Sequence, residues 1–245
     1  MSGFSVRLDK YLVDRGDFES RNRAIEAIKT GQVTLNGHPA KPSATVNDTD
    51  TVEVESAKYY VSRAARKLEG FLAEHPLYVM ARRALDIGSS TGGFTQILLE
   101  KGVRSVDCVD VGRDQLHTSL RRDPRVAVHE QTDIRDFAPS KRFDLIVSDV
   151  SFISLLHILE SVDRLAASGA DIILLFKPQF EVGREAKRDS KGVVTDKAAI
   201  TEVMTWFEVA TAELGWSLQE KIPSSVVGKE GNREWVYYFQ GASSK

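Results

Sequence analysis

The stretch Ala84-Leu85-Asp86-Ile87-Gly88-Ser89-Ser90-Thr91-Gly92-Gly93-Phe94-Thr95 decides the fold of this chain. A short apolar run ends in a carboxylate, glycines and small residues follow, and a helix is predicted to begin near Phe94. Glycine lets the backbone turn sharply and lie close to a ligand because it has no Cβ atom. The pattern predicts a strand, a loop and a helix that together fit a nucleotide-sized cofactor.

Further strand-like runs follow this stretch, with helix-length segments between them. They lie at 105–109, 125–128, 144–147 and 171–176, and two more, at 216–222 and 235–239, are predicted to form a final antiparallel pair. Alternation of strands and helices is typical of a parallel sheet that helices cover on both faces. We therefore predict an α/β fold with a Rossmann-like, mostly parallel sheet of seven strands.

Acidic residues follow three successive strands of this predicted sheet. Asp86 ends the first strand, Asp110 ends the second, and Asp133 follows the third. A carboxylate after the second strand can accept hydrogen bonds from both hydroxyls of an adenosine ribose, and Asp133 can accept one from an adenine amino group. These residues indicate a nucleoside crevice that suits NAD or S-adenosylmethionine. The glycine spacing differs from the dinucleotide pattern Gly-x-Gly-x-x-Gly and favours the second.

The first 57 residues have the pattern of a separate small α+β unit. Apolar residues at helical spacing indicate two helices, and Asn36-Gly37 between short alternating runs favours a tight hairpin turn. A basic segment without acidic residues comes next. We predict domains at 1–57 and 67–245, joined by a linker at 58–66.

Charge and cysteine content limit the classes of partner. The chain has 33 Lys+Arg against 35 Asp+Glu, a formal charge of −2, so a nucleic acid must be held by a local basic surface. The single cysteine, Cys108, excludes an internal disulfide and is expected to be a small buried residue of a cytoplasmic protein. The sequence predicts no membrane segment and no metal site, and it specifies no oligomeric state.

Four charged residues lie beside apolar runs or open the second domain: Lys67, Asp149, Lys177 and Glu234. Their order resembles the Lys-Asp-Lys-Glu tetrad of FtsJ-related ribose 2′-O-methyltransferases. A ribose hydroxyl is a poor nucleophile, so methyl transfer needs a base that removes its proton. The resemblance implies that Lys177 is this base, that Asp149 aligns it, and that Lys67 and Glu234 tune and position the pair.

Three motifs in the first unit resemble the S4 RNA-binding domain. They are Arg7-Leu8-Asp9-Lys10-Tyr11-Leu12, Ser20-Arg21-Asn22-Arg23-Ala24 and the segment 28–37, which ends in Val-Thr-Leu-Asn-Gly. The resemblance predicts phosphate contacts from Arg7, Lys10, Arg21, Arg23 and Lys29, to which we add the linker residues Arg63 and Arg66. An ordinary solvated helix face is the alternative.

Across nearly the whole chain, the order of these motifs resembles the TlyA family of ribosomal RNA methyltransferases, historically labelled hemolysins. The resemblance implies transfer of a methyl group from S-adenosylmethionine to a cytidine ribose of ribosomal RNA, so RNA or a ribosomal subunit is the expected partner. The implied cofactor-binding residues are Asp86, Gly88, Ser89, Ser90, Thr91, Gly92, Gly93, Phe94, Thr95, Asp110, Val111, Asp133, Ile134 and Asp149.

Two departures from these patterns stand out. Ser90 occupies a position where methyltransferases often have glycine, and Ala64-Ala65 replaces a glycine pair usual in the TlyA family. Two rival hypotheses stay open: a non-catalytic RNA-binding or ribosome-assembly factor, and a membrane-lysing protein. The absence of an amphipathic or apolar insertion segment disfavours the second.

Overall fold

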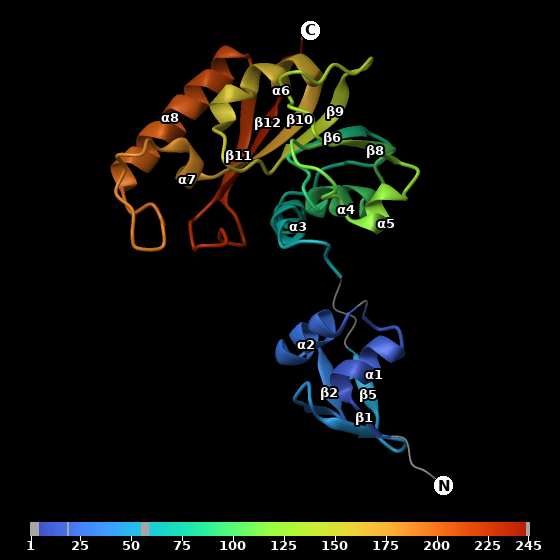
Figure 1. Ribbon diagram of the computed structural model, residues 1–245. Helices are drawn as coiled ribbons and strands as arrows, with labels where there is room; N and C mark the ends of the chain where they lie inside the picture. The colour runs from blue at the N-terminus through green and yellow to red at the C-terminus, as the bar shows by residue number, and fades with distance from the viewer. Residues whose placement is uncertain (1–4, 19, 55–58, 244–245) are drawn as a thin grey trace. The chain divides into compact units, whose positions relative to one another are not determined.

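A computed structural model describes residues 5–18, 20–54 and 59–243, and the chain divides into two compact units, Met1–Tyr59 and Tyr60–Lys245 (Figure 1). Of the predicted linker 58–66, residue 58 lies outside the described residues, and helix α3 (Ala64–Glu74) begins inside it. Alanine favours a helix over glycine by about 1 kcal/mol per residue. The pair Ala64-Ala65 therefore suits the start of this helix.

The smaller unit combines two helices with short antiparallel strands. Its elements are β1 (Ser5–Arg7), α1 (Leu8–Asp14), α2 (Arg21–Lys29), β2 (Val33–Leu35), β3 (His38–Pro39), β4 (Thr45–Asn47) and β5 (Val52–Val54). Asn36 and Gly37 have φ angles of 53° and 75°, which form the predicted tight turn between β2 and β3. Leu8, Ala24 and Ile28 are buried in the core of this unit.

The larger unit is built on one seven-stranded sheet. In spatial order its strands are β11 (Ser217–Pro223), β12 (Trp235–Gln240), β10 (Ala166–Phe176), β9 (Phe143–Ser148), β6 (Arg83–Ile87), β7 (Ser105–Val109) and β8 (Val126–His129). The strand β12 pairs antiparallel with both of its neighbours, and the other pairs are parallel. The predicted α/β fold with a mostly parallel sheet is confirmed.

Helices cover both faces of this sheet (Figure 1). They are α3, α4 (Gly93–Glu100), α5 (Thr118–Arg121), α6 (Leu159–Leu165), α7 (Pro178–Glu181) and α8 (Lys197–Glu213), together with the 3₁₀ helix η1 (Leu155–His157). Because side chains alternate along a strand, Ile172 and Leu174 pack in one hydrophobic layer with α6 and α8, whereas Ile173 packs in the other with α3 and α4. Cys108 is buried in this second layer, and burial raises the pKa of its thiol.

The strand order brings the functional loops to one edge. The first strand, β6, lies between β7 and β9, so the chain reverses its direction of travel across the sheet there, and ligands bind at such points in open α/β sheets. The antiparallel register Phe176↔Trp235 places Lys177 and Glu234 at the same edge, although 56 residues, 178–233, lie between them in the sequence.

Candidate active site

The structure brings all four tetrad residues together. Lys67 lies on α3, Asp149 directly follows β9, Lys177 directly follows β10, and Glu234 directly precedes β12. Lys177 Nζ is 2.5 Å from Asp149 Oδ1, and Lys67 Nζ is 2.6 Å from Glu234 Oε2 and 3.8 Å from Asp149 Oδ2. These contacts form one chain, in which each carboxylate contacts an ammonium group.

The tetrad is largely shielded from water. Relative exposure is 8% for Lys67, 6% for Lys177 and 2% for Glu234, and the Asp149 side chain is 12% exposed. Isolated charges cannot be buried cheaply, but two ammonium groups and two carboxylates in alternation compensate each other. Such an arrangement holds a lysine amine at a fixed place beside a carboxylate that stabilises its charged form.

Two polar contacts of the tetrad come from residues that the sequence did not single out as site residues. Ser151 Oγ is 2.8 Å from Lys177 Nζ, and Gln179 Nε2 donates a hydrogen bond of 3.1 Å to Glu234 Oε1. Each of these residues lies two positions after a tetrad member. Their position close to Asp149 and Lys177 in the sequence was the available indication of a role at the site. Sequence position does not show where a side chain points.

The loops that carry the tetrad are tied together by Glu181. This carboxylate on α7 accepts hydrogen bonds from Ser154 Oγ at 2.5 Å and from the Leu155 backbone N–H at 2.9 Å. Burial raises its pKa above the ordinary value. The contact fixes the start of η1, and with it the segment after Asp149, against α7.

Below the glycine loop, Asp86 contacts Thr95. Asp86 is 1% exposed, and its Oδ2 atom accepts hydrogen bonds from the Thr95 backbone N–H at 3.0 Å and from Thr95 Oγ1 at 2.6 Å. Burial raises the pKa of Asp86 to about 7. Phe94 is buried in the core as well. These three predicted cofactor residues therefore shape the loop from beneath, and the exposed surface of the site is formed by others.

Asp110 and Val111 form the part of this surface that suits an adenosine. Asp110 accepts hydrogen bonds from the backbone N–H groups of Ser90 at 2.8 Å and Gly112 at 2.7 Å, so its carboxylate is oriented at the mouth of the loop. Val111 is 72% exposed and offers an apolar surface beside it. The charges of Asp149 and Asp110 also contribute to the raised pKa of Asp86. This group of carboxylates, with an oriented ribose acceptor, fits a nucleoside that carries a positive charge.

Two predicted cofactor-binding residues after the third strand, Asp133 and Ile134, have different surroundings. Asp133 accepts hydrogen bonds from Arg135, which lower the pKa of Asp133 to about 2, and Ile134 is 6% exposed.

In residues 5–18, 20–54 and 59–243, no group of three or more His, Cys, Asp or Glu side chains is placed to hold a metal ion.

Comparison with known proteins agrees with this geometry. The family model described as FtsJ-like methyltransferase matches residues 60–241, and the S4 domain model matches residues 6–52. The chain is 46% identical to a 23S rRNA (cytidine-2′-O)-methyltransferase TlyA of Campylobacter jejuni, over 96% of this chain and 99% of that protein. The chain belongs to the TlyA family of FtsJ-like methyltransferases.

Matches to two further proteins also extend over most of both chains. A 16S/23S rRNA (cytidine-2′-O)-methyltransferase TlyA of Mycobacterium tuberculosis is 42% identical, over 96% of this chain and 90% of that protein. A solved structure of a hemolysin-named protein from Streptococcus thermophilus has 34% identity and a TM-score of 0.71, covering 98% of this chain and 90% of that chain. The name hemolysin therefore occurs among relatives of the same architecture.

In the S4 domain, one buried carboxylate holds two of the predicted RNA-binding residues. Asp9 is 0% exposed, and its Oδ2 atom is 2.9 Å from both Arg7 Nη2 and Arg21 Nη2. The side chains of Arg7 and Arg21 are each 54% exposed. The two guanidinium groups thus form a fixed cationic pair on the surface of this domain.

The other predicted RNA-binding residues of the S4 domain have contacts other than Asp9 or are exposed, and two further ones lie in the methyltransferase domain. Lys10 contacts Asp14 at 3.5 Å, Arg23 contacts Glu26 at 3.9 Å, and Lys29 is exposed. Arg63 Nη2 donates to the Val227 carbonyl at 3.0 Å, and the Arg66 guanidinium lies 5.3 Å from the centroid of the Tyr60 ring. The structure brings Arg7 and Arg21 together on Asp9. Within the described residues it shows no such shared anchor for Lys10, Arg23, Lys29, Arg63 and Arg66.

The Asp9 anchor predicts a pH-dependent stability of the S4 domain. Hydrogen bonds from Arg7 lower the pKa of Asp9 to about 2 from 3.8, so its contribution is complete above about pH 4 and is lost as the pH falls toward 2. Asp9→Asn should lower the free energy of unfolding of this domain by about 2 kcal/mol at pH 7. Denaturant unfolding at several pH values should show the difference from the wild type shrinking below pH 4.

The matched control for this measurement is Asp14→Asn, because Asp14 forms an exposed ion pair with Lys10 on the same helix. Such a pair contributes about 0–1 kcal/mol. Equal destabilisation by both variants would contradict the anchoring role of Asp9.

The loop that follows Asp110 has its own carboxylate anchor. Glu130 accepts hydrogen bonds from the backbone N–H groups of Asp114 at 2.7 Å, Gln115 at 2.9 Å and Leu116 at 3.0 Å, and it pairs with Arg121 at 2.6 Å. The bond from the Leu116 N–H contributes most to the lowered pKa of Glu130. Asp114 has a φ angle of 52°, a conformation that few non-glycine residues adopt, so Glu130 stabilises a strained loop.

Glu130→Gln should therefore weaken adenosylmethionine binding about fivefold, because the loop that carries Val111 loses a charge-assisted anchor. Isothermal titration calorimetry of the full chain measures this dissociation constant. Glu202→Gln, an exposed position on α8, serves as the control. Unchanged affinity in Glu130→Gln would show that the loop does not depend on this carboxylate.

Proposed function

We propose that this chain is a ribosomal RNA 2′-O-methyltransferase that transfers a methyl group from S-adenosylmethionine to a cytidine ribose. The observation that carries the proposal is the buried contact of Lys177 Nζ with Asp149 Oδ1 at 2.5 Å beside the glycine loop. It supports the proposal because an amine that can act as a base then lies at the edge of the sheet where the nucleoside crevice is predicted. The names of the Campylobacter jejuni and Mycobacterium tuberculosis relatives support the substrate class.

In the proposed reaction Lys177 accepts the proton of the ribose 2′-hydroxyl. The ammonium group that forms stays paired with Asp149, which stabilises the new charge. Lys67 holds the second oxygen of Asp149, and Glu234 in turn holds Lys67. Burial of these side chains keeps water from competing for the base.

The cofactor-binding part of the proposal assigns separate duties to the loop residues. Adenosylmethionine, when bound, supplies an electrophilic methyl group on a positively charged sulfur. Asp110 would accept hydrogen bonds from the ribose hydroxyls of the cofactor and Val111 would pack on its adenine, while Asp86 and Thr95 maintain the loop. Gly88, with a φ angle of 74°, allows the tight turn against Val150 that no larger residue permits without strain.

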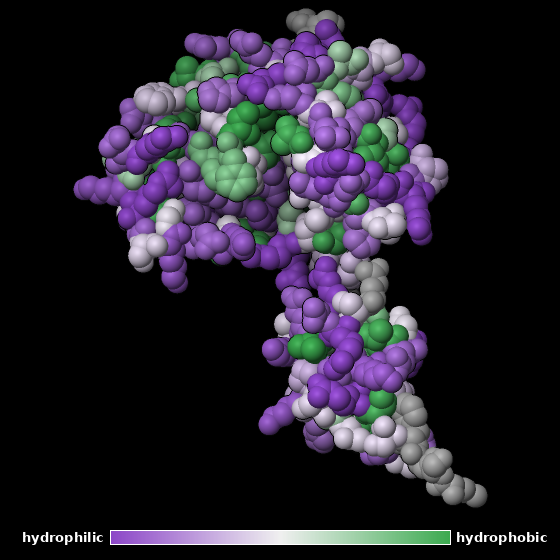
Figure 2. Space-filling model, in the orientation of Figure 1, coloured by the Kyte–Doolittle hydropathy of each residue, from purple (hydrophilic) through white to green (hydrophobic). Residues whose placement is uncertain are grey.

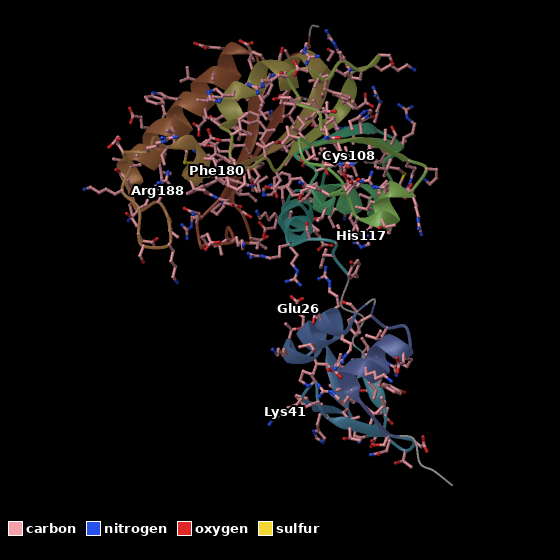
Figure 3. All side chains as sticks on the ribbon, viewed as in Figure 1. Glu26, Lys41, Cys108, His117, Phe180 and Arg188 are labelled. Carbon is pink, nitrogen blue, oxygen red and sulfur yellow. The ribbon has the colours of Figure 1, made fainter. Side chains whose placement is uncertain are left out.

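The RNA-binding part of the proposal rests on charge and on aromatic side chains. Arg7 and Arg21 offer fixed positive charges for phosphates. Figure 2 shows hydrophobic residues gathered in the middle of the larger unit, in the area where Figure 3 labels Phe180. There Phe152 is 91% exposed, with its ring centroid 5.1 Å from that of Phe180. The exposed Phe152 ring, packed on the half-buried Phe180 beside a candidate base, suits an unpaired nucleotide, since bases stack on aromatic rings.

Incubation of the chain with adenosylmethionine and unmodified ribosomal RNA, followed by nucleoside mass spectrometry, tests this function. The expected product is 2′-O-methylcytidine. A folded protein that binds RNA but yields no methylated nucleoside would support the non-catalytic assembly factor instead. As to the membrane-lysing hypothesis, no helix within the described residues is both long and apolar enough to cross a bilayer, and a liposome leakage assay tests the activity directly.

A further inference from the structure

The amine of Lys177 has a second close partner besides Asp149. The Ser151 hydroxyl oxygen is 2.8 Å from Lys177 Nζ, whereas the backbone carbonyl of Asp149 is 3.4 Å away. Ser151 is exposed at the rim of the site, while Lys177 is 6% exposed. Two short polar contacts therefore hold the amine, one from a carboxylate and one from a hydroxyl group.

Two acceptors fix the orientation of an amine in a way that one acceptor cannot. A neutral lysine amine has two N–H groups and one lone pair, arranged tetrahedrally with the carbon around the nitrogen. If Asp149 alone accepts one N–H, rotation about the Cε–Nζ bond still lets the lone pair occupy either of two positions. If Ser151 accepts the second N–H, the lone pair is confined to the third position. Orientation of this kind lowers the barrier of a reaction that needs a defined direction of attack.

We propose that Ser151 is a positioning residue for methyl transfer, which fixes the rotation of the Lys177 amine so that its lone pair faces the ribose 2′-hydroxyl. This inference rests on the proposed function, because it requires Lys177 to accept the ribose proton. In that step the ribose O–H bond breaks and an N–H bond forms on Lys177. The freed oxygen electron pair forms the bond to the methyl carbon, and the electron pair of the broken carbon–sulfur bond stays on sulfur.

Ser151 keeps its own proton throughout this reaction. Its oxygen accepts a hydrogen bond from Lys177 both before and after the transfer, so its role is geometric. Its contact with the charged form of the amine has a further effect. A hydrogen bond to an ammonium group favours the charged form, so removal of the hydroxyl group makes loss of the proton easier.

The experiment compares Ser151→Ala, Ser151→Cys and Ser151→Thr in the full chain, with the ribosomal RNA substrate that the wild type methylates. Alanine lacks the acceptor, cysteine is similar in size but a weak acceptor, and threonine retains the hydroxyl group. We expect kcat to fall about tenfold in the first two variants, with KM values for both substrates within about twofold of wild type. Ser151→Thr should restore most of the rate, and Ser168→Ala, an exposed control on β10, should match the wild type.

The rate–pH profile separates positioning from a general loss of structure. In Ser151→Ala the acid limb of the kcat profile should move to lower pH, because the charged amine loses a hydrogen-bond acceptor, and Ser151→Thr should not show this change. A wild-type kcat in Ser151→Ala would overturn the inference. A lowered kcat with an unmoved acid limb would do so too, as would an equal loss in Ser151→Thr. Absence of methylation by the wild type would instead refute the proposed function, and this inference with it.

Discussion

Lys177→Ala should abolish measurable methyl transfer, with a rate loss of about 10³-fold, while adenosylmethionine still binds. A general base contributes roughly 10²–10⁴-fold to a reaction of this kind. Cofactor binding should be retained because Lys177 lies outside the glycine loop, whose conformation depends on the contact between Asp86 and Thr95. Single-turnover methylation assays measure the rate, and calorimetry measures the affinity for the cofactor.

Lys177→Arg makes the same test without removal of the positive charge. A guanidinium group can keep an ion pair with Asp149 but does not lose its proton under these conditions, so this variant should be as inactive as Lys177→Ala. Lys197→Ala, at an exposed position on α8, should retain full activity. Appreciable turnover by Lys177→Arg would contradict the assignment of the base and would leave Lys177 with only an electrostatic role.

Gly93→Ala should weaken adenosylmethionine binding more than tenfold and destabilise the methyltransferase domain by about 1–3 kcal/mol. Gly93 is the first residue of α4, and a Cβ atom there would lie 2.8 Å from the Ala65 backbone nitrogen and would overlap Ser62 Oγ. The start of α3 would have to shift, and the cofactor loop would shift with α4. Calorimetric titration and thermal melts measure the two effects.

Gly183→Ala is the matched control for this substitution, because no atom lies within 4 Å of the added Cβ and no positive φ angle is recorded there. It should leave both cofactor affinity and melting temperature close to the wild-type values. Wild-type affinity in Gly93→Ala would show that the contact between α3 and the cofactor loop tolerates an added methyl group, and that the two elements are not coupled through it.

The location of the tetrad could be predicted from sequence because sheet topology leaves few choices. Asp149 and Lys177 directly follow apolar runs that were predicted as strands of one sheet, and Glu234 directly precedes another. Parallel strands end at a common edge, and an antiparallel strand begins there. These positions agree with the resemblance of the order Lys67, Asp149, Lys177 and Glu234 to a methyltransferase tetrad, which predicted that the four side chains meet. The structure brings them together, while their individual roles stay predictions.

The local partners of these groups could not be predicted in the same way. The contact between Asp86 and Thr95 was not predicted: the turn of the glycine loop folds the helix start over the strand end, so the two side chains are hydrogen-bonded to each other, and their contact with the cofactor stays a prediction. The sequence predicted Arg7 and Arg21 as individual phosphate contacts and did not show their shared partner. Because α1 and α2 pack together, both guanidinium groups contact Asp9. Such contacts depend on the packing of one element on another, which residue spacing does not record.

The burial of Cys108 has a practical consequence for solution measurements. It is the sole cysteine of the chain, it is 1% exposed, and burial raises the pKa of its thiol, so it should be slow to react with maleimide dyes (Figure 3). Cysteines introduced at exposed positions, such as Lys41→Cys and Glu202→Cys, can then be labelled without background. Energy transfer between two such fluorophores would measure changes in the distance between the S4 domain and the methyltransferase domain as ribosomal RNA is added.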